Sequence, residues 1–156
     1  MHVTIYVHAH AMVYPEIVNS ESELVWEALH RVHAKLDLII EREVKTATGL
    51  SMALLDALRV LDQTVSHFTM AELADRVLLS RTRVSRVVDE LVGAGLVARE
   101  SNPDDGRSSF VTLTKEGRQK VEKALPVYKA AVNREIKKLL SPQQLRQLAD
   151  SLDKAQ

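Results

Sequence analysis

The chain contains no cysteine, and this absence removes a large part of the chemistry that a protein can perform. Disulfides, thiolate metal sites, thiol nucleophiles and a cysteine redox switch are all excluded. Only five glycines occur, and they form no glycine-rich phosphate-binding loop. No Ser-His-Asp order stands out, and the acidic residues mostly occupy helix caps and helix faces rather than a paired constellation. We therefore expect a protein that is not an enzyme and that needs no cofactor.

The sequence also lacks net charge and long apolar runs. Acidic and basic residues balance at 21 each, which leaves no global field for a polyanion but does not exclude a local basic face. No apolar run approaches the roughly 18 residues that span a membrane, and the opening residues do not resemble a signal peptide. We therefore expect a cytoplasmic protein without a membrane partner. Its 156 residues suffice for one compact domain with a real core.

Apolar residues recur at helical spacing in the first and last parts of the chain. One set alternates spacings of four and three residues, which is a heptad seam: Val25, Leu29, Val32, Leu36 and Ile39. Similar stripes predict a long helix after Thr114 and a last helix that Ser141 and Pro142 open. These outer helices are too long and too apolar for a lone small domain. We therefore expect a second subunit to cover them.

The central segment carries helix caps in close succession. Ser51 precedes one apolar stripe, and Thr69 with Glu72 three residues later predicts a capping box for a short helix. Ser80 follows as the next N-cap, and Gly95 ends the helix that it opens. The buried stripe predicted for that helix is Val84, Val87, Val88, Leu91 and Val92.

Two short strands, predicted at 96–101 and 109–114, follow and flank a turn-rich loop. The fold class is therefore mainly α with a small β-hairpin wing. Its core is a winged helix-turn-helix flanked by long dimerisation helices.

The helix after Ser80 has a polar face opposite its valines. Arginine forks match both guanine edges and phosphates, and hydroxyl groups donate to phosphates or bases. The second helix of a helix-turn-helix reads DNA with its N-terminal residues, which is where these side chains gather. An ordinary solvated helix face is the alternative interpretation. The residues predicted to contact double-stranded DNA here are Ser80, Arg81, Thr82, Arg83, Ser85 and Arg86.

Arg107 stands two residues after Asp105 at the predicted hairpin tip. A lone arginine at a turn is usually just exposed to solvent. An arginine on a protruding tip, however, can enter the narrow and electronegative minor groove beside the major-groove helix. Asp105 would then hold the guanidinium group of Arg107 in position.

The segment from Met70 to Arg118 resembles the core of the MarR family of winged-helix transcription regulators. The motifs that carry the resemblance are "ELVGAGLVAR", then Asp105-Gly106-Arg107, then "LTKEG", in the family's order and spacing. Gly106 departs from the pattern, because many members carry a second basic residue there, and this would soften contacts made by the wing. The extension before Pro15 is not part of the pattern.

The resemblance implies a homodimer that binds a pseudo-palindromic operator, usually as a repressor. It also implies a small-molecule pocket between the dimerisation helices and the DNA-binding lobe. The domains expected are an N-terminal extension at 1–18, a dimerisation region at 19–48 and 115–156, and a DNA-binding domain at 49–114. A winged helix used only as a protein-interaction module is the alternative.

Trp26, His30 and His33 share a helical face on the first long helix. We interpret them, with Arg31, as candidate effector-binding residues: the tryptophan would stack on an aromatic or anionic effector, and a histidine or Arg31 would take its charge. The alternative is that Trp26 belongs to a dimer core and the histidines are ordinary. His30 and His33 with Asp37 also have spacing that suits a metal-responsive regulator, but three ligands leave a site open, so no metal site is predicted.

Overall fold

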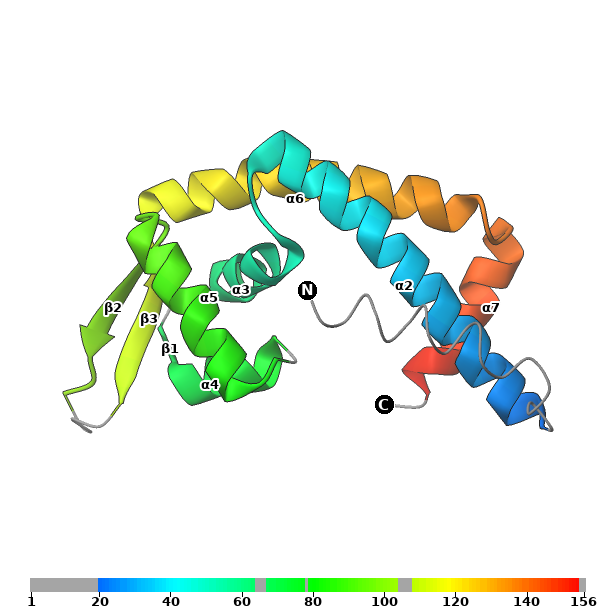
Figure 1. The fold of residues 1–156 in the computed structure, drawn as a ribbon, viewed down its shortest axis with the longest axis horizontal. Helices are drawn as coiled ribbons and strands as arrows, with labels where there is room; N and C mark the ends of the chain where they lie inside the picture. The colour runs from blue at the N-terminus through cyan, green and yellow to red at the C-terminus, as the bar shows by residue number, and fades with distance from the viewer. Residues whose placement is uncertain (1–19, 64–66, 78, 104–107, 155–156) are drawn as a thin grey trace. The chain divides into compact units, whose positions relative to one another are not determined.

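The computed structural model describes residues 20–63, 67–77, 79–103 and 108–154 (Figure 1). These described residues form six helices and three strands, of which the strand β1 and the helix α4 are the shortest. In chain order they are α2 (Glu21–Thr48), α3 (Met52–Asp62), β1 (Phe68–Thr69), α4 (Met70–Arg76), α5 (Arg81–Gly93), β2 (Val97–Ser101), β3 (Ser109–Leu113), α6 (Lys115–Lys137) and α7 (Pro142–Asp153). The mainly helical fold with a β-hairpin wing is confirmed.

Contacts divide the chain into two compact units. The central unit, Glu41–Arg134, holds the last turns of α2, all elements from α3 to β3, and most of α6. The terminal unit holds the rest of α2, the end of α6 and α7, within residues 1–40 and 135–156. No helix in the described ranges is both long and apolar enough to cross a membrane.

The predicted helix caps are confirmed by hydrogen bonds. The Ser51 side chain accepts from the backbone N–H of Leu54, which satisfies one of the donors that open α3. Thr69 and Glu72 form the predicted capping box of α4, and Ser141, predicted to open α7, forms a second capping box with Gln144. These side chains fix where each helix begins.

The core of the central unit lies between α3, α4, α5 and the sheet. The largest side chains that are fully removed from solvent there come from each of these elements: Leu55, Leu58, Leu73, Val84, Val88, Leu91 and Val111. Val87 is also buried, as predicted, but the burial predicted for Val92 is wrong, because 39% of Val92 is exposed. Eight residues carry the helix about 80° beyond Val84, so Val92 lies at the edge of the stripe in the last turn.

The wing belongs to a three-stranded sheet rather than to an isolated hairpin. β3 lies in the middle and pairs antiparallel with both neighbours, Val97 opposite Leu113 on β2 and Phe68 opposite Val111 on β1. The β2 and β3 strands were predicted, whereas β1 was not. A strand of two residues shows no period-2 pattern, and only pairing with distant residues creates it.

The junction between α5, the wing and α6 explains several motif residues. Gly95 has φ +71°, the left-handed conformation that ends α5 and that glycine adopts without strain. The Thr114 hydroxyl donates to the Gly95 carbonyl at 2.8 Å and accepts from the Gly117 N–H at 3.0 Å. A Cβ atom on Gly117 would collide with the backbone carbonyl of Leu96. Gly117 therefore lets α6 pass close to the start of β2.

The terminal unit leaves much of its apolar surface exposed. The first three residues of the heptad seam, Val25, Leu29 and Val32, are 58%, 40% and 40% exposed. On α7 no residue is buried, and Leu148 and Leu152 are 40% and 47% exposed. Monomeric proteins rarely leave so many large apolar side chains in contact with water on neighbouring helices.

Candidate nucleic-acid interface

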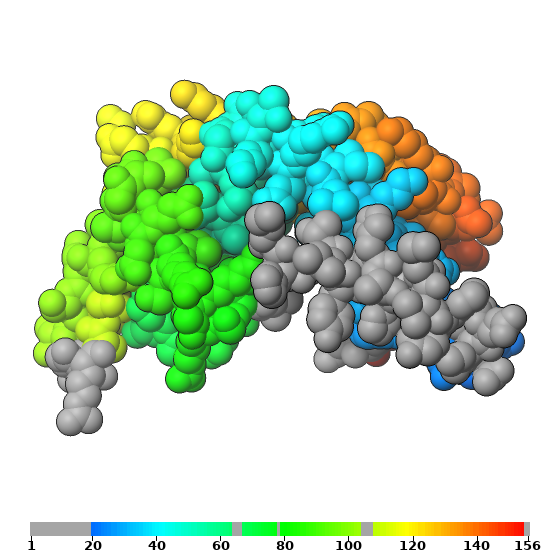
Figure 2. All heavy atoms as spheres, in the orientation of Figure 1, coloured from blue at the N-terminus to red at the C-terminus, as the bar shows by residue number. Residues whose placement is uncertain are grey.

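The first half of α5 presents polar side chains above a buried valine face. Ser80 caps the helix by accepting from the Arg83 N–H at 3.4 Å. Ser85 is half-buried, whereas the other five predicted contact residues are exposed: Ser80, Arg81, Thr82, Arg83 and Arg86. In Figure 2 the atoms of α5 form part of the visible surface (green), so this helix is open to a large partner on that face.

The arginines of this helix are available to a ligand. Within the described ranges, no ion pair involves Arg81, Arg83 or Arg86. Unpaired guanidinium groups at a helix N-terminus, where the backbone dipole also favours negative charge, suit phosphate oxygens and guanine edges. This geometry can bind a polyanion.

A groove of about 440 Å³ runs beside these arginines, between α3 and α5. The residues that line it come from both helices and the turn before α5: Ser51, Ala53, Ser80, Thr82, Arg83, Arg86, Val87 and Glu90. Sequence reasoning missed Ser51, Ala53 and Glu90 as parts of this surface. No local signal could have found them, because the packing of α3 on α5 creates the groove.

An ion pair connects α5 to the wing. The guanidinium Nη2 of Arg99 on β2 lies 3.0 Å from Oδ1 of Asp89 and also contacts the sulfur of Met70 at 3.8 Å. Asp89 lies on the exposed side of α5 and pairs there with the wing. Arg99 thereby links α5, β2 and the start of α4, so it helps to orient the recognition helix relative to the wing.

The base of the wing loop is closed by two hydrogen bonds between Asn102 and Ser108. The Asn102 N–H donates to the Ser108 carbonyl at 3.3 Å, and its side-chain amide donates to the Ser108 hydroxyl at 2.8 Å. Asp105 and Arg107, the residues predicted to reach the minor groove, lie outside the described residues.

The candidate effector residues all lie on α2 and are exposed. The rings of Trp26 and His30 contact each other in a tilted arrangement, with their centroids 4.3 Å apart and their planes at 49°. Arg31 lines a hollow of about 250 Å³ with residues from the end of α6, whereas Trp26, His30 and His33 are not part of its lining. Among the residues with described positions, no group of three or more histidine or acidic side chains is arranged to hold a metal ion.

A helix-turn-helix, a wing on the next strands and an arginine-bearing second helix define a winged-helix DNA-binding protein. A model of the MarR family matches residues 48–108. The transcriptional repressor Rv2887 of Mycobacterium tuberculosis is 34% identical over 119 residues, which cover 74% of this chain and 82% of the repressor. The chain therefore belongs to the MarR family, whose members are transcription regulators and not enzymes.

Solved structures show the same fold. Sco3205, a MarR-family regulator from Streptomyces coelicolor solved in complex with DNA, is 27% identical, with a TM-score of 0.79 over 90% of this chain and 89% of that one. Bordetella bronchiseptica BpsR, whose DNA binding is regulated by 6-hydroxynicotinic acid, is 22% identical, with a TM-score of 0.76 over 85% of this chain and 98% of its own. This second likeness concerns the fold alone.

Proposed function

We propose that this DNA-binding regulator is a homodimeric repressor that binds a pseudo-palindromic operator and releases it when a small-molecule effector binds. One observation carries the proposal: the N-terminal half of α5 presents exposed arginines that form no ion pair with any described residue, on a helix whose other face is buried in the core. A rigid helix with such a face has the shape and charge that the major groove requires.

The proposed contacts extend the sequence interpretation. The side chains assigned to the major groove and its phosphates are Ser80, Arg81, Thr82, Arg83, Ser85 and Arg86. Arg107, positioned by Asp105, would enter the adjacent minor groove from the wing. Residues 49–114 would form the DNA-binding domain, and the flanking helices would form the dimer.

The exposed apolar side chains of α2 and α7 support a homodimer. A second copy of the same helices would remove Val25, Leu29 and Leu148 from water, and a two-fold axis is the commonest symmetry for such an assembly. Two recognition helices related by that axis would read half-sites about 10 bp apart. The regulator would act in the cytoplasm, where its DNA target lies.

Two comparisons support repression and its relief. Rv2887 is named as a repressor, and BpsR shares the fold and responds to an aromatic acid. An effector of aromatic or anionic character is therefore the class proposed for this chain. Binding would change the spacing between the two recognition helices, so that both could no longer occupy adjacent half-sites.

Replacing Arg86 tests the proposed interface. We expect Arg86→Ala to weaken binding to a selected operator by about 1–3 kcal/mol and to reduce the preference for operator over unrelated DNA, because a base contact is lost. Fluorescence anisotropy with both DNAs measures the two effects. Arg146→Ala is the matched control, since Arg146 is an exposed arginine on α7 outside the interface. Unchanged operator affinity in Arg86→Ala would contradict the assignment.

The same titration, repeated at several salt concentrations, distinguishes the proposed regulator from the other candidate, a winged helix that binds only proteins. Phosphate contacts release counterions, so DNA binding by the wild-type chain should fall steeply with salt. If the chain instead binds every DNA weakly, with an affinity that does not change with salt, the protein-interaction module is favoured.

A further inference from the structure

Glu90 lies in the groove between α3 and α5, beside arginines that are assigned to DNA. It follows Arg86 by four residues and Arg83 by seven, and a helix places residues at these spacings on one face. All three side chains are exposed and line the groove. A partner that engages the two arginines therefore also comes close to the Glu90 carboxylate.

The opposite wall of the groove suits an anion as well. It is formed by Ser51 and Ala53 at the start of α3, a helix whose first turn contains no acidic residue. A helix N-terminus carries partial positive charge, which favours the phosphate groups of a DNA backbone. Among the described residues that line the groove, Glu90 is the only acidic one.

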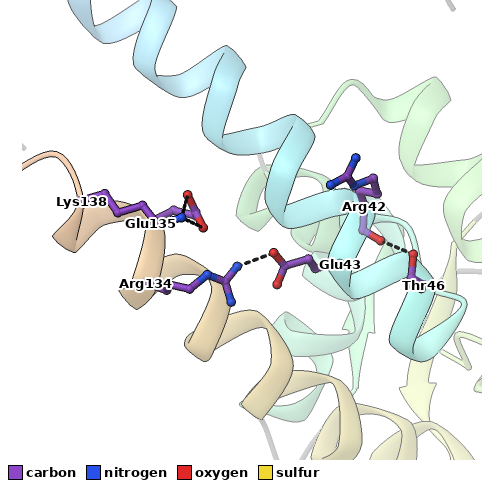
Figure 3. Close-up of polar contacts among 6 residues, drawn as sticks. All are labelled: Arg42, Glu43, Thr46, Arg134, Glu135 and Lys138. Atoms are coloured by element: carbon purple, nitrogen blue, oxygen red, sulfur yellow. Dashed lines mark hydrogen bonds and ion pairs between the residues drawn. The ribbon is translucent and has the colours of Figure 1, made fainter.

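Several other acidic side chains of the protein are neutralised by ion pairs. Asp89, the neighbour of Glu90 in the sequence, lies 3.0 Å from the guanidinium group of Arg99. Figure 3 shows two further examples: Glu43 with Arg134 and Glu135 with Lys138. Glu90 forms no ion pair with any described residue, although Arg86 lies one helical turn away. Its negative charge therefore faces the groove without a partner.

The order of the two charges along α5 agrees with the absence of a pair. At a spacing of four residues, an acidic residue stabilises a helix best when it precedes the basic one, and Arg86 and Glu90 have the reverse order. An exposed ion pair also gains little free energy, because two long side chains must be held in one geometry. Arg86 thus stays available to DNA, and Glu90 stays available to oppose it.

We propose that Glu90 limits the affinity of this protein for DNA by repelling the backbone phosphates that enter the groove between α3 and α5. The carboxylate acts against the phosphates that Arg83 and Arg86 attract, and it contacts no base. Two unit charges about 4 Å apart in water change an equilibrium constant roughly fivefold. This inference rests on the proposed function and adds to it a residue that weakens DNA binding.

Such a repulsion acts most visibly on DNA that lacks an operator. Phosphate contacts supply essentially all of the free energy of nonspecific binding, whereas base contacts add to them at an operator. A constant repulsion leaves the ratio of the two affinities unchanged, but the weaker, nonspecific complex dissociates first as protein concentration falls. Glu90 would thereby keep the protein from being held on DNA that it does not regulate.

Fluorescence anisotropy of the full chain with a selected operator and with an unrelated duplex tests the proposal. We expect Glu90→Gln to tighten binding to both DNAs by a similar factor, about threefold to tenfold, because the repulsion is lost. Glu90→Lys should tighten both further. Glu122→Gln is the matched control, since it removes the same charge from an exposed position on α6 outside the groove, and it should bind as the wild type does.

Salt provides a second readout of the same variants. The Debye length falls from about 30 Å at 0.01 M to about 8 Å at 0.15 M ionic strength, so added salt screens the repulsion. The difference in affinity between Glu90→Gln and the wild type should therefore shrink as salt rises. A role of Glu90 in packing alone would give a difference that does not depend on salt.

Three results would overturn the proposal: equal affinities of Glu90→Gln and Glu122→Gln, a gain that does not change with salt, or an effect confined to one of the two DNAs. Loss of operator binding alone would mean that the carboxylate accepts from a base, as it can from the amino group of cytosine. The wild-type titration keeps the two levels of the account apart. A wild type that binds its operator while Glu90→Gln changes nothing disproves only this inference, whereas a wild type that binds no DNA disproves the proposed function.

Discussion

At the scale of single residues, side chains whose role depends on local spacing could be predicted, and those whose role depends on tertiary packing could not. The polar face of α5 follows from helical periodicity, so Arg81 and Arg86 were assigned to it correctly as exposed residues. The pairing of Asp89 with Arg99 requires β2 to fold back beside α5, and no sequence pattern reports that approach. The assignment of Arg107 to the minor groove stays a prediction.

The Asp89–Arg99 pair gives a prediction at this scale. Both side chains are partly exposed, so we expect a coupling free energy of only about 0.2–1 kcal/mol in the stability of the fold. A double-mutant cycle with Asp89→Asn and Arg99→Gln, measured by urea unfolding, gives this value. Operator affinity should fall more in Arg99→Gln than the small stability loss explains, because the wing loses its link to α5. A variant with wild-type operator affinity would show that the pair does not position the wing.

At the scale of elements, helix starts were predictable because a cap is a contact between residues three apart. Thr69 with Glu72 and Ser141 with Gln144 are encoded within four residues each, and the structure contains both boxes. β1 was missed because two residues carry no periodic signal and the strand exists only through its pairing with β3. The exposure of Val92 was missed because the extent of burial depends on what covers the last turn.

The capping box of α4 predicts a dependence of stability on pH. The Thr69 backbone N–H and then its hydroxyl donate to the Glu72 carboxylate, both at 2.8 Å, and these bonds lower the pKa of Glu72 below its ordinary value. Because the folded-state pKa is the lower one, the stabilisation is present above the unfolded-state pKa and is lost as pH falls through the folded-state pKa. The loss should therefore occur at pH values below the ordinary glutamate pKa of 4.5.

Glu72→Gln is the control, because glutamine keeps the hydrogen-bonding geometry but does not titrate. We expect the free energies of unfolding of wild type and Glu72→Gln to converge as pH falls through this range. Urea unfolding at several pH values measures the difference. A difference that stays constant with pH would exclude a titrating capping box.

Gly117 gives the second prediction at this scale. A methyl group there would meet the Leu96 carbonyl and lie 2.8 Å from Cδ1 of Leu113, and the backbone cannot yield as a flexible side chain would. We expect Gly117→Ala to destabilise the fold by about 3 kcal/mol, at the upper end for overpacking, even though alanine favours a helix. Gly93→Ala is the matched control, because no atom lies within 4 Å of the Cβ atom that it adds. We expect it to stabilise α5 by up to about 1 kcal/mol. Equal effects of the two substitutions on the thermal midpoint would refute the close contact.

At the scale of the whole molecule, the single chain exposes more apolar surface than a stable monomer usually does. The heptad seam of α2 was read from spacing alone, and the structure leaves its first half in solvent. Under the proposed function, the central unit would contact DNA and the exposed apolar helices of the terminal unit would associate with a second subunit. No motif of the chain predicts the operator sequence, because the base pairs that are read depend on the three-dimensional placement of the recognition helices.

The measurement that tests the central proposal most directly is the selection of genomic DNA fragments by the purified full chain, followed by sequencing. It should be done at about 150 mM salt, where binding through phosphates alone is suppressed. We predict an enriched pseudo-palindrome with half-sites about 10 bp apart, because two recognition helices related by a two-fold axis must meet the same face of the duplex. Enrichment of no sequence, or of a single half-site without its inverted repeat, would contradict a homodimeric operator-binding regulator.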